Sequence, residues 1–240
     1  MFAYKIDDVI GPDAYDPRFP MHFRPRPGQH QWWTGDGRKF PLLDLDKGHP
    51  RLVVKRRLLS PELCAALIQC WKRHTDKLFP TEHDFWKERV LQHTDIPLAE
   101  ERTIHRVLQQ ARLYTQIAVM EKFAPGKPIF SDSAQIVRWS AGAELAPHAD
   151  NINPDGHPNA TPHRTHSSVL YLNDGFVGGE IFFPGLQLRV RPEPGLLIAF
   201  TSGTEHVHGV LPILSGERFT LAGWFTQDPA MADPMHDVIV

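Results

Sequence analysis

Four polar residues in the C-terminal half of the chain have the types and the spacing of a metal site beside an anion site. His148 and Asp150 lie two positions apart, His208 follows sixty positions after His148, and Arg218 lies ten beyond His208. Two imidazoles and one carboxylate make up the facial triad that binds Fe(II) and leaves coordination positions open for other ligands. Residues two apart in a strand point to the same side, so His148 and Asp150 can bind one ion from one strand end.

A second His-x-Asp triplet, His93 to Asp95, lacks this context. The chain contains 14 histidines, so chance alone supplies such triplets. No strand-like run surrounds His93, a helix-like stretch follows it, and no basic residue stands at a matching distance downstream. We therefore interpret His93 as a surface or capping histidine. His148 instead follows a strand-like run at 134–139 and precedes a loop rich in Asn, Pro, Gly and His from 151 to about 166.

Composition bounds the domain organisation. With 240 residues and 41% hydrophobic content, the chain can bury one good core. We expect one domain at 51–230, preceded by an N-terminal extension at 1–50 that packs on it and followed by a tail at 231–240. The extension is rich in Pro, Gly and aromatic residues, and we expect a structural role for it, with the covering of a substrate as the alternative.

Charge and hydropathy exclude two classes of partner. A net charge of −2 provides no broad basic surface for nucleic acid. No run approaches the roughly twenty apolar residues of a membrane span, and the first residues have no signal-peptide core, so we expect a cytoplasmic protein. Cys64 and Cys70 fall in one expected helix about 9 Å apart, which predicts reduced thiols rather than a disulfide. The sequence leaves the oligomeric state open.

The secondary-structure signals predict a mainly β fold with supporting α-helices. A strand is expected at 51–55, a helix that begins at Ser60-Pro61-Glu62, and a longer helix at about 99–123. From residue 134 onward the pattern changes to eight short strands at 134–139, 144–149, 167–173, 179–183, 186–191, 196–201, 205–211 and 217–226. This order predicts a double-stranded β-helix (jelly roll) core backed by the N-terminal helices.

The last expected strand separates two kinds of side chain. Arg218, Thr220, Ala222 and Trp224 share one face, whereas Phe219, Leu221 and Phe225 share the face that the helices would cover. Arg218 then points into the barrel, where a buried guanidinium without a carboxylate partner costs several kcal/mol. No acid in the sequence is placed to pair with it, so a bound dicarboxylate is the expected partner.

The motifs follow one another in a fixed order over about residues 134–230. They are His148-Ala149-Asp150-Asn151, His163-Arg164, the segments 169–174, 176–183 and 199–203, His208-Gly209-Val210, Gly216-Glu217-Arg218, and Trp224-Phe225-Thr226. In order and spacing they resemble the 2-oxoglutarate- and Fe(II)-dependent dioxygenases of the prolyl hydroxylase superfamily. Within that superfamily they are most similar to the catalytic domain of the leprecan-type prolyl 3-hydroxylases.

The resemblance implies roles for the matching residues. His148, Asp150 and His208 would be the iron ligands, and Arg218 would bind the distal carboxylate of 2-oxoglutarate, accompanied by Thr220 and Tyr171. His206 competes with His208, because both are expected on the same side of one strand; the family spacing favours His208.

Substrate contacts are implied less directly. Asn151, His163, Arg164 and Trp224 match positions near the expected site, and the loop at 151–166 is long enough to act as a lid. Trp139 and Leu145 stand where many prolyl 4-hydroxylases have tyrosines, so the substrate geometry of those enzymes does not transfer directly. The large N-terminal regions and the retention signal of leprecan enzymes are not seen in this sequence, so the resemblance does not imply collagen as the substrate.

The implied reaction is hydroxylation of a prolyl or related amino-acid or peptide substrate. It would be coupled to decarboxylation of 2-oxoglutarate to succinate and CO₂, with Fe(II) as cofactor, O₂ as co-substrate and ascorbate as a further candidate. Two alternatives remain open from the sequence. One is a zinc hydrolase that uses the same three metal ligands, and the other is a non-catalytic jelly roll that binds sugar or peptide.

Overall fold

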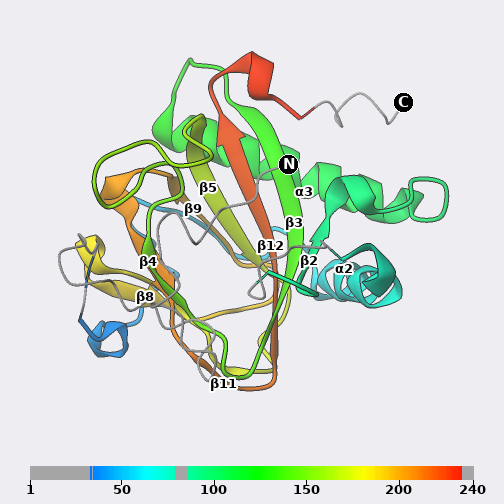
Figure 1. The fold of residues 1–240 in the computed structure, drawn as a ribbon, viewed down its shortest axis with the longest axis horizontal. Coiled ribbons are helices and arrows are strands. Elements are labelled where there is room, and N and C mark those ends of the chain that lie inside the picture. The colour runs from blue at the N-terminus through cyan, green and yellow to red at the C-terminus, as the bar shows by residue number, and fades with distance from the viewer. Residues whose placement is uncertain (1–32, 34, 79–85, 234–240) are drawn as a thin grey trace.

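The computed structural model describes residues 33, 35–78 and 86–233, and its core is a pair of antiparallel sheets packed face to face (Figure 1). The larger sheet has the strand order β1-β9-β5-β12-β3-β2. Its strands are β1 (Val53–Lys55), β9 (Leu197–Thr201), β5 (Arg164–Tyr171), β12 (Glu217–Thr226), β3 (Phe130–Ser140) and β2 (Val90–Gln92). The smaller sheet, of order β4-β10-β7-β8, contains β4 (Leu145–His148), β10 (His208–Val210), β7 (Ile181–Phe183) and β8 (Leu188–Val190). A short ribbon pairs β11 (Ile213–Ser215) with β6 (Val177–Gly178).

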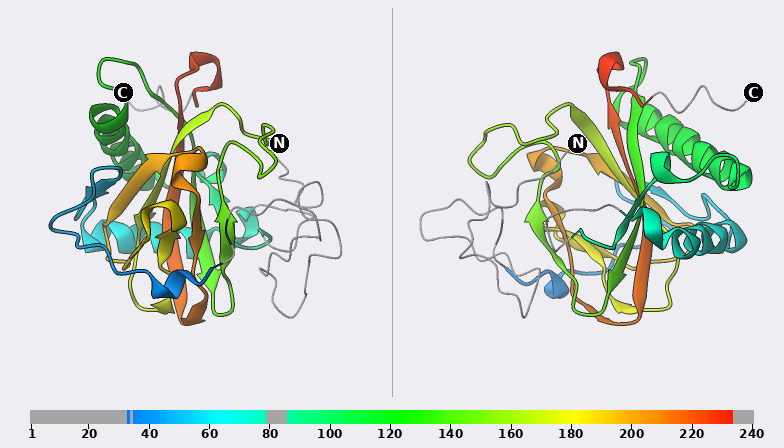
Figure 2. Two further views of the ribbon diagram at one scale, coloured as in Figure 1. Left: turned by 90° about the vertical axis from the view of Figure 1, so that its left-hand side faces the viewer. Right: turned by 45° about the vertical axis from the view of Figure 1, so that its right-hand side comes forward.

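Two helices cover the outer face of the larger sheet, as the second view of Figure 2 shows. The first is α2 (Pro61–Arg73), where the Ser60 side chain accepts a hydrogen bond from the Leu63 backbone N–H and Pro61 occupies the first turn. The second is α3 (Arg102–Phe123), which begins slightly later than the pattern predicts. The mainly β fold with supporting helices is confirmed.

Two apolar cores hold these layers together. One lies between the helices and the larger sheet and includes Leu67, Leu108 and Phe219, each at most 2% exposed. The other lies between the two sheets and includes Tyr171, Phe183 and Phe200, all fully buried. The larger sheet therefore has an inner face toward the smaller sheet and an outer face toward the helices.

Strand β12 has the predicted separation of faces. Phe219, Leu221 and Phe225 belong to the core beneath the helices. Arg218 and Thr220 lie on the inner face and are buried, at 2% and 3% exposure. Because side chains alternate along a strand, one ten-residue segment both supports the helices and supplies the interior of the barrel.

Several short elements differ from the predictions. Strands β2 and β11 were not predicted, since these three-residue segments are not part of a longer strand-like run in the sequence. The expected strand 205–211 is a 3-10 helix (Thr204–His206) followed by β10, and the expected strand 186–191 is reduced to β8. His93 directly follows β2 and is 2% exposed, so its interpretation as a surface or capping residue is wrong. Its Nδ1 instead hydrogen-bonds the Ala134 carbonyl.

The described part of the N-terminal extension lies against the smaller sheet. Leu42 forms a bridge with Arg189, and the Trp33 ring lies 5.6 Å from that of Phe182. Residues 1–32 and 34 lie outside the described residues, so the wider expectation for residues 1–50 stays a prediction. At the other end, Asp233 is still buried, and residues 234–240 of the expected tail lie outside the described residues.

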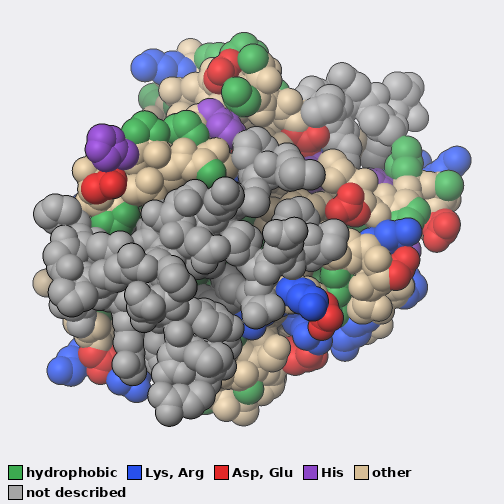
Figure 3. Space-filling model, in the orientation of Figure 1, with side chains coloured by type: hydrophobic (Ala, Val, Ile, Leu, Met, Phe, Trp, Pro, Cys, Tyr) green, Lys and Arg blue, Asp and Glu red, His purple; other side chains and the backbone are tan. Residues whose placement is uncertain are grey.

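The surface charge, the helices and the two cysteines agree with the composition of the sequence. On the face viewed in Figure 3, the basic and acidic side chains of the described residues are interspersed, with no broad patch of one sign. None of the described helices combines the length and the apolarity needed to cross a membrane. Cys64 and Cys70 are free, as predicted, and both are buried.

Candidate active site

The three predicted metal ligands converge at the ends of two paired strands. His148 ends β4 and lies directly opposite His208, the first residue of β10. Asp150 reaches between them, with its Oδ1 3.3 Å from His148 Nε2 and its Oδ2 4.0 Å from His208 Nε2. One ligand atom from each residue lies within 4.8 Å of the other two. This set has the composition of a facial triad and can hold one divalent metal ion.

Backbone contacts orient both histidines for metal binding. Nδ1 of His148 lies 3.0 Å from the Ala146 carbonyl, and Nδ1 of His208 lies 3.0 Å from the His206 carbonyl. A carbonyl only accepts, so each Nδ1 carries a proton and each Nε2 is the ligand atom. The backbone of Asp150 is fixed as well, because its N–H donates to the Ser202 carbonyl and its carbonyl accepts from the Thr161 hydroxyl.

The electrostatics favour a cation at this place. Burial alone would raise the pKa of Asp150, but its interactions with the neighbouring His208 and His148 rings, including a hydrogen bond from His148, lower it, so the carboxylate is ionised. Burial, reinforced by the neighbouring His148, lowers the pKa of His208 to about 4. Burial opposes protonation of His148 too, yet its hydrogen bond to Asp150 raises its pKa. His208 is thus neutral and ready to bind, and a metal ion would displace the proton of His148.

Arg218 lies deeper in the barrel and is paired with no carboxylate among the described residues. Its guanidinium is packed over two aromatic rings, 5.1 Å from the centre of Tyr171 and 5.6 Å from that of Trp139. Its Nε and the Tyr171 hydroxyl are buried without a hydrogen-bond partner. Burial lowers the pKa of Arg218 and raises that of Tyr171, so the pair presents a cation and a neutral phenol. An anion beside them would satisfy both groups.

The sheet register explains why these residues meet. Arg218 pairs with Trp139 on β3, and Thr220 pairs with Tyr171 on β5. Gly179 leaves room for the arginine: a Cβ at this position would lie 3.0 Å from Arg218 Cδ, and the backbone φ is +70°. Arg218, Thr220 and Tyr171 are therefore buried neighbours on the inner face of the larger sheet.

The predicted substrate residues gather at a rim formed by β3, β5 and β12. Arg164 packs on Trp224, with its Cζ 4.1 Å from the ring centre, and its backbone carbonyl accepts a hydrogen bond from Asn151. Asp132 holds the group together: its Oδ2 lies 2.7 Å from Arg164 Nε and 3.3 Å from His163 Nε2. Sequence reasoning missed Asp132, because β3 begins at Phe130 and not at the predicted residue 134.

The segment that contains these residues is similar to a known protein family. Residues 134–226 match the family model of the 2OG-Fe(II) oxygenase superfamily. These residues form a 2OG-Fe(II) oxygenase domain. The match includes all three metal ligands and Arg218, Thr220 and Tyr171.

Individual relatives of this oxygenase domain are prolyl hydroxylases. Prolyl 3-hydroxylase 3 of Homo sapiens is 44% identical over 94 residues, which cover 34% of this chain and 13% of that protein. Prolyl 3-hydroxylase 1 of Mus musculus is 33% identical over 149 residues, which cover 51% of this chain and 20% of that protein. The chain thus spans only a small part of the length of these relatives.

Solved structures agree on the fold. A Pseudomonas putida prolyl-4-hydroxylase aligns with a TM-score of 0.52 at 26% identity, covering 74% of this chain and 93% of its own. A viral collagen prolyl hydroxylase from Paramecium Bursaria Chlorella virus-1 in complex with 2OG aligns with a TM-score of 0.57 at 22% identity, covering 73% and 95%. The likeness to the viral enzyme is one of fold, and the predicted jelly roll is confirmed.

The described residues of the oxygenase domain fit both groups in its family name. The Nε2 atoms of His148 and His208 and the ionised carboxylate of Asp150 are suitable ligands for Fe(II). The dicarboxylate 2-oxoglutarate fits the unsatisfied Arg218 Nε and Tyr171 hydroxyl. The alternative ligand His206 is excluded by its place: it ends a 3-10 helix, and its ring nitrogens contact Thr201 and the Arg51 carbonyl instead.

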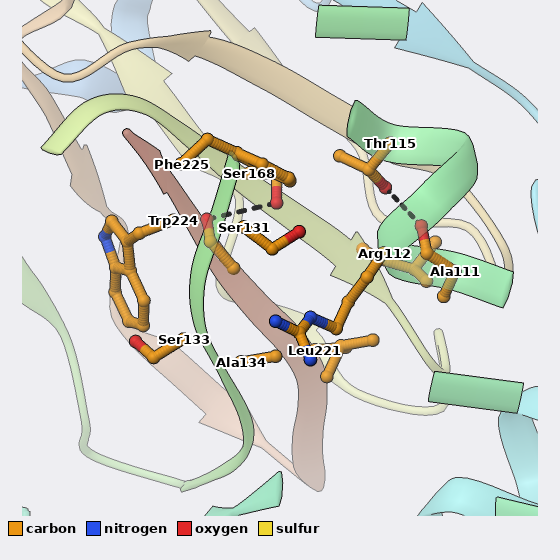
Figure 4. A pocket seen from close by; sticks show the side chains of 12 residues that line it. Ala111, Arg112, Thr115, Ser131, Ser133, Ala134, Ser168, Leu221, Trp224 and Phe225 are labelled. Carbon is orange, nitrogen blue, oxygen red and sulfur yellow. Dashed lines mark hydrogen bonds between the residues drawn. The ribbon is translucent and has the colours of Figure 1, made fainter. Parts of the chain in front are cut away.

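Two other polar features lie away from this site. Cys70, His74 and Glu101 are close enough to hold a metal ion, but Glu101 Oε1 already contacts both Arg73 and His74. This arrangement is an ion pair that joins the C-terminus of α2 to the N-terminus of α3. A small cavity between α3 and the outer face of the sheet is lined partly by Arg112, Ser168 and Leu221 (Figure 4).

Proposed function

We propose that the protein is a 2-oxoglutarate-dependent dioxygenase that hydroxylates a prolyl or related residue within a peptide or protein. The observation that supports this best is the pairing of a facial triad with a buried guanidinium that no described carboxylate satisfies. A metal ion alone would need only the first feature, whereas a dicarboxylate co-substrate requires both. The names of the prolyl hydroxylase relatives support the prolyl substrate class.

Each residue has a definite task in this proposal. His148 and His208 would hold Fe(II) through Nε2 and Asp150 through a carboxylate oxygen, which is the ligand set of a facial triad. Arg218 donates to the distal carboxylate of 2-oxoglutarate, with Tyr171 as a second donor. Their burial keeps water away, which strengthens these charge-assisted hydrogen bonds. Thr220 offers a further hydroxyl on the same face.

The bound groups supply the oxidation. With Fe(II) in place, 2-oxoglutarate, O₂ and a substrate C–H group would be converted into succinate, CO₂ and a C–OH group. Succinate and the new hydroxyl group would each receive one oxygen atom of O₂, and the CO₂ would be released from the carboxylate next to the keto group of 2-oxoglutarate. Arg218 would hold the co-substrate, and the rim that contains Arg164 and Trp224 is the proposed contact surface for the substrate.

The rim favours a peptide over a free amino acid. Asp132 neutralises the Arg164 guanidinium through a 2.7 Å contact, and His163 shares the same carboxylate. A paired guanidinium is a poor partner for a free carboxylate, but its remaining N–H groups still donate to carbonyl oxygens. Trp224 adds an aromatic surface for an apolar ring such as that of proline.

The zinc hydrolase and the non-catalytic jelly roll are not favoured. Both alternatives are compatible with the positions of His148, Asp150 and His208. Neither gives a reason for a fully buried guanidinium with an unsatisfied Nε below the metal site.

Mass spectrometry of candidate substrates tests this proposal. Proline-containing peptides and free proline are incubated with the protein, Fe(II), 2-oxoglutarate and ascorbate, and products are searched for the mass of one added oxygen atom. Hydroxylated peptide from the wild type and none from His208→Ala is the expected result. Oxidation that is equal in both proteins, or confined to free proline, would contradict the proposed substrate class.

A further inference from the structure

Asp150 is the member of the metal-ligand set that lies outside the strands. His148 ends β4 and His208 begins β10, and these two residues pair directly across the sheet. Asp150 follows the end of β4 and lies in the loop. Among the described residues, its backbone is held from two sides. Its N–H donates to the Ser202 carbonyl at 2.9 Å, and its carbonyl accepts from the Thr161 hydroxyl at 2.9 Å.

Thr161 is itself firmly fixed. It is 4% exposed, and its N–H donates to Asn159 Oδ1 at 2.8 Å. Its carbonyl accepts the N–H of Arg164, the first residue of β5, at 3.2 Å. A hydroxyl has one proton to donate, and the 2.9 Å contact with the Asp150 carbonyl is shorter than the 3.4 Å contact with Asn159 Oδ1. The Thr161 hydroxyl therefore donates to the backbone of the metal ligand.

A second hydrogen bond closes the same loop. Asn151, the neighbour of Asp150, donates from its Nδ2 to the Arg164 carbonyl at 2.8 Å. Arg164 is also the rim residue that packs on Trp224. Thr161 thus contacts the metal ligand through its hydroxyl and the rim through its carbonyl, and it connects the two parts of the site.

We propose that Thr161 is a positioning residue for the metal ligand Asp150 and links this ligand to the rim. A metal ion needs the carboxylate at a fixed place beside the two imidazoles, and a loop residue keeps that place only if its backbone is held. Loss of a partner that orients a metal ligand typically lowers metal affinity about 10- to 100-fold. Because coupling is reciprocal, metal binding must also stabilise the hydrogen bonds around Thr161. The inference rests on the proposed metal site and adds a residue to it.

Thr115 on α3 is a matched control for Thr161. It is also 4% exposed, and its hydroxyl donates to a backbone carbonyl, that of Ala111, at 2.7 Å (Figure 4). Thr115→Val and Thr161→Val each remove one buried threonine hydroxyl and keep the shape of the side chain. Only the second change affects the metal ligand.

The test is a calorimetric titration of the metal-free full chain with Mn²⁺ at fixed pH. Thr161→Val is expected to weaken Mn²⁺ binding about ten-fold, because the Asp150 carbonyl loses its donor. Thr161→Ser keeps the hydroxyl and is expected to restore the affinity close to that of the wild type. Thr115→Val is expected to bind Mn²⁺ as the wild type does.

Two results of this titration would overturn the inference and leave the proposed function intact. One is equal Mn²⁺ affinity in the wild type and Thr161→Val. The other is an equal loss in Thr161→Val and Thr161→Ser, since the hydroxyl would then not be the group that matters. A wild type that binds no Mn²⁺ would overturn both the inference and the proposed function.

Hydrogen–deuterium exchange of the wild type adds a test that needs no variant. The amides of Thr161 and Arg164 donate to Asn159 Oδ1 and to the Thr161 carbonyl, so their exchange reports on the base of this loop. Saturation with Mn²⁺ is expected to slow exchange across residues 159–164. Unchanged exchange there, in a protein that binds Mn²⁺, would overturn the inference even if Thr161→Val does not fold.

Discussion

At the scale of single residues, Arg218 is expected to favour ligand binding and to lower the stability of the ligand-free protein. Its guanidinium is buried, stacked on Trp139 and Tyr171, and has no described carboxylate partner. A buried charge of this kind destabilises the folded protein until a ligand pairs with it. The free energy that the ligand gains at Arg218 is therefore partly the relief of a penalty already present in the protein.

Replacement of this arginine should affect binding and stability in opposite directions. Arg218→Met is expected to weaken 2-oxoglutarate binding at least 100-fold, measured by calorimetry with Mn²⁺ in place of iron. The same variant should be more stable without ligand, by about 1–4 kcal/mol in urea unfolding, since it removes an unpaired buried charge. Tyr171→Phe is the milder comparison, with a loss of about ten-fold or less. Unchanged 2-oxoglutarate affinity in Arg218→Met would contradict its assigned role.

His166 gives a residue-scale prediction about pH. Burial, with His206 nearby, lowers its pKa to about 4, against an ordinary value of 6.5. Between these two pH values the unfolded chain binds a proton that the folded protein does not, so stability rises with pH across this window. The contribution is complete above pH 6.5 and is lost as the pH falls toward 4. Its size is on the order of 3 kcal/mol.

Urea unfolding between pH 4 and 7 checks this contribution. His166→Gln should flatten the dependence of the unfolding free energy on pH, while His157→Gln, a change of an exposed loop histidine, should leave the wild-type slope. Glu205 and His206 also titrate in this region, so part of the slope remains in His166→Gln. Identical slopes for wild type and His166→Gln would show that His166 does not have the assigned environment.

At the scale of elements, three neighbouring strands carry most of the residues around the co-substrate and the proposed substrate. Strands β3, β5 and β12 carry Trp139, Tyr171 and Arg218 near one end and the Asp132, Arg164 and Trp224 rim near the other. Because side chains alternate, the same strands present their other faces to α2 and α3. A residue in one of these strands therefore affects either the core beneath the helices or the site, according to its position.

Asp132 is the rim residue whose change is most informative. Asp132→Asn keeps the size of the side chain but leaves Arg164 without its counter-charge. We expect the KM for peptide substrate to rise about ten-fold, with little change in the affinity for Mn²⁺ or 2-oxoglutarate. Asp155→Asn, in an exposed part of the following loop, serves as the control with unchanged KM. An equal loss of Mn²⁺ affinity in Asp132→Asn would mean that the residue supports the whole site and not the rim.

At the scale of the whole molecule, a buried ion-pair cluster fastens the chain after β12 to the rest of the domain. Asp233 Oδ2 lies 2.8 Å from Arg112 on α3 and also contacts the His93 ring. Its backbone N–H donates to the Ser131 carbonyl at the start of β3. This cluster connects the C-terminal end of the described chain, the long helix and the central sheet.

Loss of this cluster should destabilise the protein strongly. Asp233→Asn leaves Arg112 buried and uncompensated, with an expected loss of about 3–5 kcal/mol in unfolding free energy. Glu217→Gln breaks the partly exposed pair with Arg138 and should cost less than about 1 kcal/mol. Chemical denaturation of the two variants distinguishes the cases. Similar losses would argue against a special role for the buried cluster.

The sequence predicted what depends on local pattern and missed what depends on packing. Alternation along β12 and the cap at Ser60 predicted the faces of a strand and the start of α2 correctly. The three-residue strands β2 and β11 have no pattern of their own and exist only because β3 and β6 offer pairing edges. His93 was wrongly predicted to be a surface residue because it follows the unpredicted strand β2. Asp132 could not be singled out from the sequence because its partner Arg164 lies 32 residues away, on β5.

The most direct test of the central claim is the formation of succinate from 2-oxoglutarate by the purified protein with Fe(II), O₂ and a substrate peptide. If His148, Asp150, His208 and Arg218 form one site, the wild type and His157→Ala will form succinate in step with the O₂ consumed. His208→Ala will form none, although Arg218 is unchanged. Succinate formation that continues in His208→Ala would contradict the account.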